Sequence, residues 1–184
     1  MAALEGCPLE YPAAGIWEYA GAIGQDSHRF VNPDELAAQP RRPLILGGVI
    51  LPGEPALSGN SDADVVLHAL VNAISGLTGQ NVLGARADRL CLEQGISDSA
   101  VYLREAMADL GDWQLCHISL SVEGQRPRLA LWIDRIRLRL AELTGLTAAD
   151  IGMTATSGEG LTAFGRGEGL QVFCLVTARR PARH

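Results

Sequence analysis

The order of apolar and polar residues along the chain predicts helices that alternate with strands. Apolar side chains recur at spacings of three and four in three stretches, which predicts helices over residues 62–78, 97–110 and 129–144. Ser61 or Asp62 can cap the first helix, and Ser97-Asp98 can cap the second, because short polar side chains accept hydrogen bonds from the first free backbone N–H groups. The chain therefore has at least three helices to pack against its strands.

Strand patterns occupy the remaining apolar segments. Alternation and short apolar runs predict strands over residues 20–25, 115–123, 151–156 and 170–178, and a hairpin over residues 44–51. Residues 1–19 are expected to form an irregular extension, residues 32–43 a proline-rich loop, and residues 179–184 a polar tail. Interleaved helices and strands without a repeat predict one domain over residues 20–178 with an α/β fold, an α+β sandwich whose helices pack on one face of a mixed four-stranded sheet.

Composition narrows the class of protein. Of the 184 residues, 47% are hydrophobic and 20% are charged, which is typical of a folded globular domain and excludes general disorder. The net charge of −6 argues against a protein that binds nucleic acid through a basic surface. No apolar run is long enough to span a membrane, and the first thirty residues have no signal-peptide or transit-peptide pattern.

The spacing of the cysteines argues against disulfides and against a cysteine metal site. Four of them lie far apart, without the short spacing of a metal site: Cys7, Cys91, Cys116 and Cys174. We expect reduced thiols, as in a soluble cytoplasmic protein, rather than disulfides or metal ligands.

Asp26, His28 and His68 form the first candidate site. Residues two apart on an extended strand point to the same face, so the side chains of Asp26 and His28 converge. With His68 from the first predicted helix, they would give two imidazoles and a carboxylate, which leaves one position open on a tetrahedral zinc ion. The alternatives are a solvated turn at the strand end and a structural histidine inside the core.

The stretch over residues 154–169 is the second candidate. It is rich in glycine and hydroxyl groups and follows a predicted strand, so backbone amides can approach a phosphate closely. Glu159 can hold a divalent cation, and Arg166 adds a positive charge. The alternative is an ordinary loop made of tight turns.

Four sequence motifs, taken in order, are similar to those of a known family. They are Gly24-Gln25-Asp26-Ser27-His28, Leu46-Gly47-Gly48-Val49, Ser61-Asp62-Ala63-Asp64-Val65-Val66-Leu67-His68, and residues 156–169 with their Gly-Arg-Gly-Glu-Gly signature. Together they resemble the 2-C-methyl-D-erythritol 2,4-cyclodiphosphate synthase family over residues 20–178. The resemblance implies a homotrimer around a central axis, with active sites between subunits.

The resemblance also implies a reaction and its cofactors. In this family the 2-phosphate of 4-diphosphocytidyl-2-C-methyl-D-erythritol 2-phosphate attacks the β-phosphorus of its own diphosphate. CMP leaves, and a cyclic diphosphate forms, which is a lyase reaction of non-mevalonate isoprenoid biosynthesis. The implied cofactors are one Zn²⁺ per site and a Mg²⁺ or Mn²⁺ that bridges the diphosphate. Some members accept an isoprenoid diphosphate in the central cavity of the trimer.

Roles for individual residues follow from the resemblance, position by position. The implied metal ligands are Asp26, His28, His68 and Glu159. The implied catalytic residues are Asn60, Ser157 and Glu159. The implied substrate-binding residues are Asp26, His28, Asn60, Ser61, Gly84, Gly124, Pro127, Arg128, Leu129, Ala155, Thr156, Ser157 and Arg166, the last at the central cavity.

The chain departs from the family pattern near the expected substrate. Asn60 stands where the family has a histidine, and residues 82–97 keep only Gly84 of the family's Asp-Ile-Gly and Phe-Pro-Asp motifs, which grip the methylerythritol hydroxyls. Loss of a carboxylate that binds hydroxyl groups changes which substrates a site accepts. New contacts could come from Arg86, Asp88 or Arg89.

These departures leave two alternatives to the family reaction. One is a paralogue that acts on a different cytidine diphosphate or nucleotide diphosphate. Release of CMP from the family substrate would exclude this alternative. The other is a non-catalytic trimer that binds a prenyl diphosphate, which a metal content near zero would favour.

Overall fold

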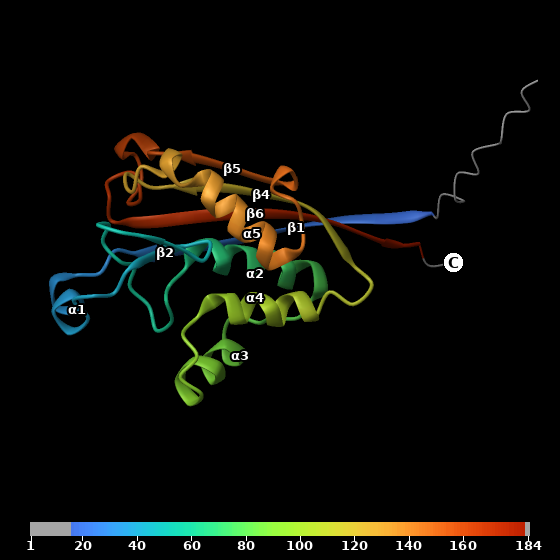
Figure 1. The fold of residues 1–184 in the computed structure, drawn as a ribbon, viewed down its shortest axis with the longest axis horizontal. Coiled ribbons are helices and arrows are strands. Elements are labelled where there is room, and N and C mark those ends of the chain that lie inside the picture. The colour runs from blue at the N-terminus through green and yellow to red at the C-terminus, as the bar shows by residue number, and fades with distance from the viewer. Residues whose placement is uncertain (1–15, 183–184) are drawn as a thin grey trace, which may run out of the picture.

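A mixed four-stranded sheet organises the structure, a computed structural model that describes residues 16–182 (Figure 1). Its strands are β1 (Trp17–Arg29), β4 (Gln114–Glu123), β5 (Ile151–Thr156) and β6 (Gly169–Pro181), in the order β1-β6-β4-β5. β6 is antiparallel to both β1 and β4, whereas β5 runs parallel to β4. The predicted mixed sheet is confirmed. The predicted hairpin is also present, as β2 (Leu44–Leu46) and β3 (Val49–Leu51).

Three longer helices correspond to the three that the apolar spacing predicts. α2 (Val65–Thr78) packs on β1 and β6, α4 (Ser99–Ala108) packs on α2, and α5 (Ile133–Thr144) contacts β5. Asp98 caps α4 as expected, and its carboxylate accepts a hydrogen bond from the Ala100 N–H at 2.8 Å. The core lies between these helices and one face of the sheet.

Asp64, and not Ser61 or Asp62, caps α2. Its fully buried carboxylate accepts from the backbone N–H groups of Val66 and Leu67 at 3.1 and 3.0 Å. It also accepts from Gly47 and Gly48 at 2.8 and 2.6 Å, where both glycines have positive φ. One side chain therefore joins the start of α2 to the turn of the β2–β3 hairpin.

Long strands at the two ends of the described chain differ from the expected boundaries. Trp17–Tyr19 belong to β1 and Arg179–Pro181 belong to β6, where an extension and a tail were expected. Trp17 pairs with Pro181 in register, and the Arg179 guanidinium lies 4.4 Å from the centre of the Trp17 ring. These contacts come from pairing between distant segments, which local patterns do not reveal. Residues 1–15, which include Cys7, and residues 183–184 lie outside the described residues.

Two further segments were not expected to be helical. The proline-rich stretch contains α1 (Pro33–Ala38), where Asn32 and Glu35 form a reciprocal capping box. Residues 82–97 contain α3 (Ala85–Asp88), followed by a π-helical turn over Arg89–Glu93. Single 3₁₀ turns occur at Leu129–Leu131, Ala148–Asp150 and Gly158–Gly160.

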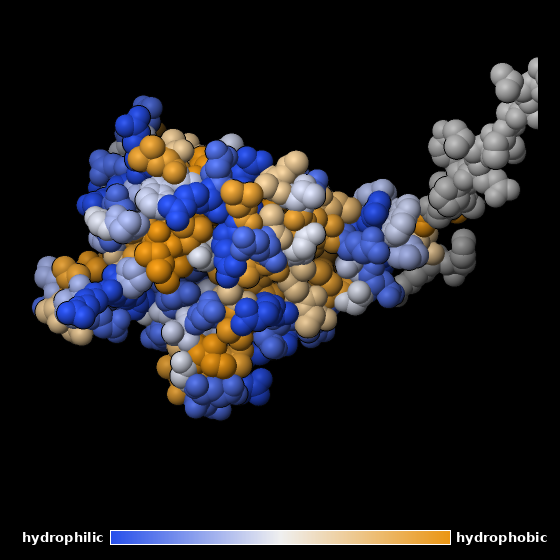
Figure 2. Space-filling model, viewed as in Figure 1, coloured by the Kyte–Doolittle hydropathy of each residue, from blue (hydrophilic) through white to orange (hydrophobic). Residues whose placement is uncertain are grey.

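The sheet face opposite the helices exposes large apolar side chains. Along β6, buried Val172, Cys174 and Val176 alternate with Phe173 and Leu175, which are 43% and 45% exposed. Ile23 of β1 pairs with Leu175 in register and is 65% exposed. On the face viewed in Figure 2, by comparison, apolar patches are interspersed with polar residues. Among residues 16–182, no helix has the length and apolar character needed to cross a membrane.

Candidate active site

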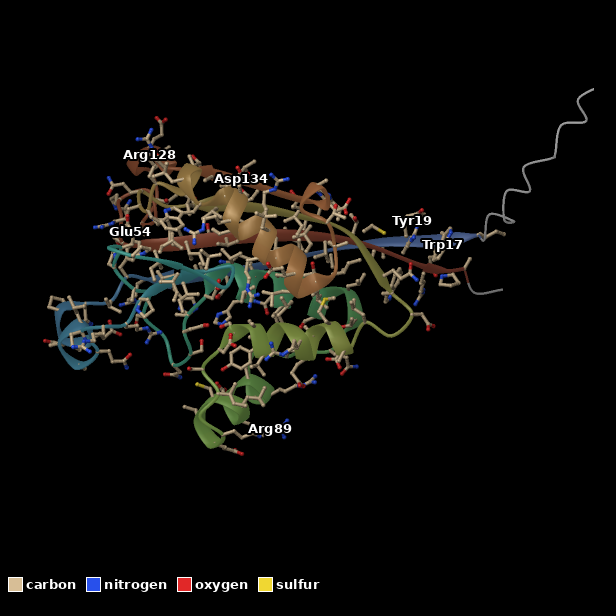
Figure 3. The ribbon with its side chains drawn as sticks, viewed as in Figure 1. Trp17, Tyr19, Glu54, Arg89, Arg128 and Asp134 are labelled. Atoms are coloured by element: carbon tan, nitrogen blue, oxygen red, sulfur yellow. The ribbon has the colours of Figure 1, made fainter. Side chains whose placement is uncertain are left out.

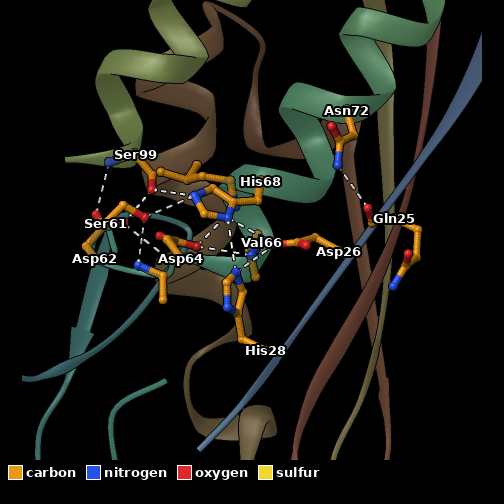
Figure 4. A network of polar contacts seen from close by, with 12 residues as sticks. Gln25, Asp26, His28, Ser61, Asp62, Asp64, Val66, His68, Asn72 and Ser99 are labelled. Carbon is orange, nitrogen blue, oxygen red and sulfur yellow. Dashed lines mark hydrogen bonds and ion pairs between the residues drawn. The ribbon is translucent and has the colours of Figure 1, made fainter. Parts of the chain in front are cut away.

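Asp26, His28 and His68 meet in space (Figure 4). Asp26 Oδ2 lies 3.1 Å from His28 Nε2 and 3.0 Å from His68 Nδ1. The two ring nitrogens lie 3.3 Å apart, and all three possible ligand atoms fall within 4.8 Å of one another. Two residues of β1 and one residue of α2 thus form the cluster that the sequence predicts.

A close approach of β1 and α2 places these side chains together. A Cβ atom at Gly24 would lie 2.3 Å from the Ala69 carbonyl oxygen and 2.2 Å from the Ala73 backbone nitrogen, so only glycine fits between the two backbones. Beside it, the Asn72 side-chain amide donates to the Gln25 carbonyl at 3.0 Å (Figure 4). This contact lies one residue from Asp26 along the strand and one turn from His68 along the helix, so it fixes the two elements at the edge of the cluster.

The electrostatics of the cluster favour an anion between two imidazoles. Burial opposes ionisation of Asp26, but the hydrogen bonds from His28 and His68 outweigh it and lower the pKa of Asp26 well below its usual value. For His28, burial acts to lower the pKa, but the hydrogen bond and charge of Asp26 outweigh it and raise the pKa above its ordinary value. The site therefore attracts positive charge.

The donor set fits a metal ion of the zinc type. The His28 Nδ1–H donates to the Ser58 carbonyl oxygen at 2.7 Å, which leaves Nε2 facing the cluster. Two imidazole nitrogens and a carboxylate oxygen are ligands that Zn²⁺ accepts, and a set of three leaves a position for substrate or water. The residues present therefore match the group that the resemblance implies.

A pocket of about 170 Å³ opens beside the cluster. His28 and His68 line it together with Asn60, Ser61 and Gly84, three residues that the sequence places at the substrate. Among the lining residues that sequence reasoning missed are Cys91 and Tyr102. Neither belongs to a motif, so no signal in the sequence marks them.

Of the three suggested replacement contacts, only Asp88 lines this pocket. Arg86 instead pairs with Glu105 and, at 2.7 Å, with Asp109 of the segment after α4. Arg89 is exposed and lies on the outer side of the α3 region (Figure 3). The structure thus provides one carboxylate near the position where the family's hydroxyl-binding motif is lost.

A second pocket, of about 400 Å³, lies at the ends of the parallel strands β4 and β5. The Gly124 N–H donates to the Thr156 carbonyl at 3.0 Å and holds the two strand ends together. Seven of the implied substrate-binding residues line it: Gly124, Pro127, Arg128, Leu129, Ala155, Thr156 and Ser157. In Figure 3, Arg128 lies at the opposite edge of the molecule from Arg89.

The structure does not bring Glu159 and Arg166 to either pocket. Glu159 is exposed at a positive φ of 50° in the β5–β6 loop, and it is not part of the metal-ligand cluster found in the described chain. Arg166 pairs with Glu168 at 3.0 Å on the surface of the same loop. The predicted site residues thus fall into three separate places on one chain.

Comparisons with known proteins agree with the resemblance. The YgbB family profile matches residues 20–179. The 2-C-methyl-D-erythritol 2,4-cyclodiphosphate synthase of Chlamydia muridarum is 48% identical over 162 residues, which cover 88% of each chain. The protein of the same description from Chlamydia trachomatis serovar L2 is 46% identical over 169 residues, covering 91% of this chain and 92% of its own.

Solved structures share the fold. The bifunctional IspDF of Campylobacter jejuni superposes with a TM-score of 0.79 at 27% identity over 90% of this chain, which spans only 43% of that longer protein. A 2C-methyl-D-erythritol-2,4-cyclodiphosphate synthase in a CDP-bound form superposes with a TM-score of 0.73 at 28% identity. It covers 86% of this chain and 99% of its own.

Proposed function

The chain belongs to the YgbB family, and we propose that Asp26, His28 and His68 form the metal centre with which it carries out the family's reaction. It is an enzyme, a lyase of isoprenoid biosynthesis that cyclises a cytidine diphosphate substrate to 2-C-methyl-D-erythritol 2,4-cyclodiphosphate. The observation that carries the proposal is the convergence of these three side chains beside the pocket lined by Asn60 and Gly84.

Asp26, His28 and His68 would hold Zn²⁺, whose charge would stabilise negative charge on the transferring phosphoryl group. Asn60, on the wall of the same pocket, would donate an amide hydrogen bond to a phosphate oxygen and orient it for attack. An amide brings no positive charge, so more of the charge stabilisation falls to the metal centre than in members with a histidine at this position. Ser61 and Gly84 would line the sugar-alcohol end of the substrate.

The second pocket would bind the cytidine diphosphate. Arg128 would neutralise diphosphate charge, and the Thr156 and Ser157 hydroxyls would donate hydrogen bonds to it, with Ser157 acting in the transition state. Glu159, from the same loop, would hold Mg²⁺ or Mn²⁺ between the phosphates. Pro127 and Leu129 provide apolar walls for the base.

A homotrimer would bring the two pockets together across subunits. On one chain the pockets share no lining residue, yet the reaction joins two ends of a single substrate. The exposed apolar sheet face, with Ile23, Phe173 and Leu175, supports burial against other copies. Arg166 would then lie at the central cavity and could bind an isoprenoid diphosphate there.

Two further features belong to this proposal. Asp88 would accept hydrogen bonds from substrate hydroxyls, because it is the carboxylate of residues 82–97 that lines the metal-side pocket. The chain would act as a single domain in the cytoplasm, which the free thiols of Cys91, Cys116 and Cys174 support.

Phosphorus NMR of the zinc-loaded protein with Mg²⁺ and 4-diphosphocytidyl-2-C-methyl-D-erythritol 2-phosphate tests the proposal. We expect cyclic diphosphate and CMP to appear together. The His68→Ala variant should lose both bound zinc and turnover while keeping the fold, because it lacks one of three ligands. Zinc content and circular dichroism measured on the same samples separate ligand loss from unfolding.

His117→Ala is the matched control, since this histidine is exposed on β4, away from the cluster. We expect it to keep zinc. Full activity of His68→Ala would overturn the metal centre. Zinc binding without turnover of this substrate would instead favour a paralogue with another nucleotide diphosphate substrate.

A further inference from the structure

The nitrogen of His68 that faces away from the cluster contacts a buried serine. His68 Nε2 lies 2.9 Å from Ser99 Oγ, and Ser99 is completely buried at the first position of α4 (Figure 4). The Asp62 carboxylate accepts two hydrogen bonds from this serine, one from its backbone N–H at 3.0 Å and a short one from its hydroxyl group. Asp62, Ser99 and His68 thus form a continuous chain of hydrogen bonds.

The direction of these bonds follows from the number of hydrogens available. A serine hydroxyl has a single hydrogen, and the Asp62 carboxylate can only accept. Because that hydrogen goes to Asp62, the Ser99 oxygen can only accept from His68, so Nε2 must carry a proton. In the neutral ring Nδ1 then carries the lone pair that a metal ion would bind, and it faces the cluster, 3.0 Å from Asp26 Oδ2 and 3.3 Å from His28 Nε2.

We propose that Ser99 and Asp62 are positioning residues that fix the ring of His68, with Nε2 protonated and Nδ1 available as the metal ligand. This inference rests on the proposed metal centre. It adds to the site two residues that belong neither to the ligand cluster nor to the lining of its pocket. Such outer partners of ligating histidines set ring orientation and raise ligand basicity.

Among the described residues, no nearby group can take over the role of Ser99 and Asp62 in holding the His68 ring. Ser61 Oγ lies 3.5 Å from His68 Nε2, beyond a normal hydrogen bond, and already accepts from the Ala63 N–H at 3.1 Å. Asp62 is itself anchored, because its backbone N–H donates to the Ser97 carbonyl at 2.9 Å. The pair therefore connects the segment before α2 to the start of α4, and it holds His68 from a fixed point.

Two variants test the inference by zinc affinity, measured in competition with a chelator. Ser99→Ala removes the acceptor for the Nε2 proton. Asp62→Asn keeps the shape, but the N–H and O–H of Ser99 donate to different oxygens of Asp62, and the amide replaces one of these oxygens with a donor. When the amide oxygen accepts from the Ser99 N–H, the amide nitrogen donates to Oγ. The Oγ hydrogen then points at His68 Nε2, which favours the tautomer with the proton on Nδ1. We expect each variant to bind zinc about 10- to 100-fold more weakly.

Asp98→Ala is the matched control. It removes the N-cap of the same helix α4, whose carboxylate accepts from Ala100, without a contact to His68. We expect this variant to destabilise the helix but to bind zinc within about threefold of the unaltered chain. That change is much smaller than the loss expected when a partner of a ligating histidine is removed. In nitrogen-15 NMR of the zinc-loaded protein, the Nε2–H signal of His68 should be protected from exchange in the unaltered chain and exposed in Ser99→Ala.

The outcomes separate this inference from the proposed function. If the unaltered chain binds zinc and both variants bind it equally well with an unchanged Nε2–H signal, the positioning role is overturned and the metal centre stands. If Asp98→Ala lost as much zinc affinity as the two test variants, the cause would be the lower stability of α4, and the inference would also be overturned. Absence of zinc binding by the unaltered chain would overturn the metal centre together with this inference.

Discussion

Each histidine of the cluster is held by an acceptor outside it. His28 uses a backbone carbonyl, that of Ser58, and His68 uses the Ser99 hydroxyl. Both rings therefore turn the opposite nitrogen toward Asp26, although one comes from a strand and the other from a helix. These outer partners decide which nitrogen of each ring faces the cluster, Nε2 in His28 and Nδ1 in His68.

The buried Cys174 thiol is expected to make the fold less stable at alkaline pH. Burial raises the pKa of its thiol to about 12, from an ordinary value of 9.0. The unfolded chain therefore ionises first, so the folded state is favoured fully below pH 9 and loses this advantage as the pH rises toward 12. Between pH 8 and pH 10.5 we expect this thiol alone to lower the free energy of unfolding by about 2 kcal/mol.

The Cys174→Ala variant isolates that contribution. Urea unfolding at both pH values should show a smaller decrease for the variant than for the unaltered chain, at equal protein concentration. The comparison uses the change with pH and not the absolute stability, because alanine also leaves a cavity. Equal decreases in the two proteins would contradict the prediction.

Sequence reasoning finds residues whose neighbours follow a local period. The side chains of Asp26 and His28 converge because they are two apart on a strand, and that could be predicted. The partnership of His68 with Ser99 depends on the packing of α4 on α2, which no local pattern encodes. Tyr102, on α4, reaches the pocket for the same reason and was missed, as was Cys91, which reaches it from the π-helical turn after α3.

The contact between β1 and α2 is the element-level feature on which the cluster depends. Gly24→Ala should lower the free energy of unfolding by about 1–3 kcal/mol, because the new methyl group overlaps the backbone of α2. It should also lower zinc affinity by moving His68 away from Asp26. Urea unfolding and chelator competition measure the two effects.

Gly76→Ala provides the comparison for the same pair of elements. Its Cβ would lie 3.5 Å from the Ala22 Cβ, an ordinary contact, and it lies in the interior of α2. We expect this variant to be more stable by up to about 1 kcal/mol, because alanine favours a helix over glycine. Similar destabilisation by both substitutions would show that crowding at Gly24 is not the cause.

Most element positions could be predicted, but their ends could not. The hydrophobic periods locate α2, α4, β4 and β5 to within a few residues. The cap of α2 was misplaced because Asp64 is fixed by the hairpin turn and not by its own helix alone. The outer ends of β1 and β6 were missed because their polar side chains pair only once the two chain ends meet, as Glu18 does with Arg180 at 2.8 Å.

The exposed apolar face of the sheet determines how the whole molecule is expected to assemble. Leu175→Glu places a charge in the centre of that face, so we expect monomers in light scattering, with an unchanged circular dichroism spectrum. Turnover should also be lost, because the two pockets of one chain do not meet.

Leu138→Glu is the corresponding control, since Leu138 is 57% exposed on α5, on the helical side of the molecule. It should keep the oligomeric mass and the activity of the unaltered chain. A Leu175→Glu protein that keeps the mass of the unaltered chain would contradict assembly through the sheet.

The place of β1 at the edge of the sheet also has a consequence for biosynthesis. β1 carries Asp26 and His28, yet its hydrogen-bonded neighbour in the four-stranded sheet is β6, which is synthesised much later along the chain. The register pairs Asp26 with Val172 and His28 with Leu170, so the backbone around both side chains is fixed only when β6 has been made. A nascent chain can form α2 early, but we expect the proposed metal centre to be complete only after β6 has paired with β1.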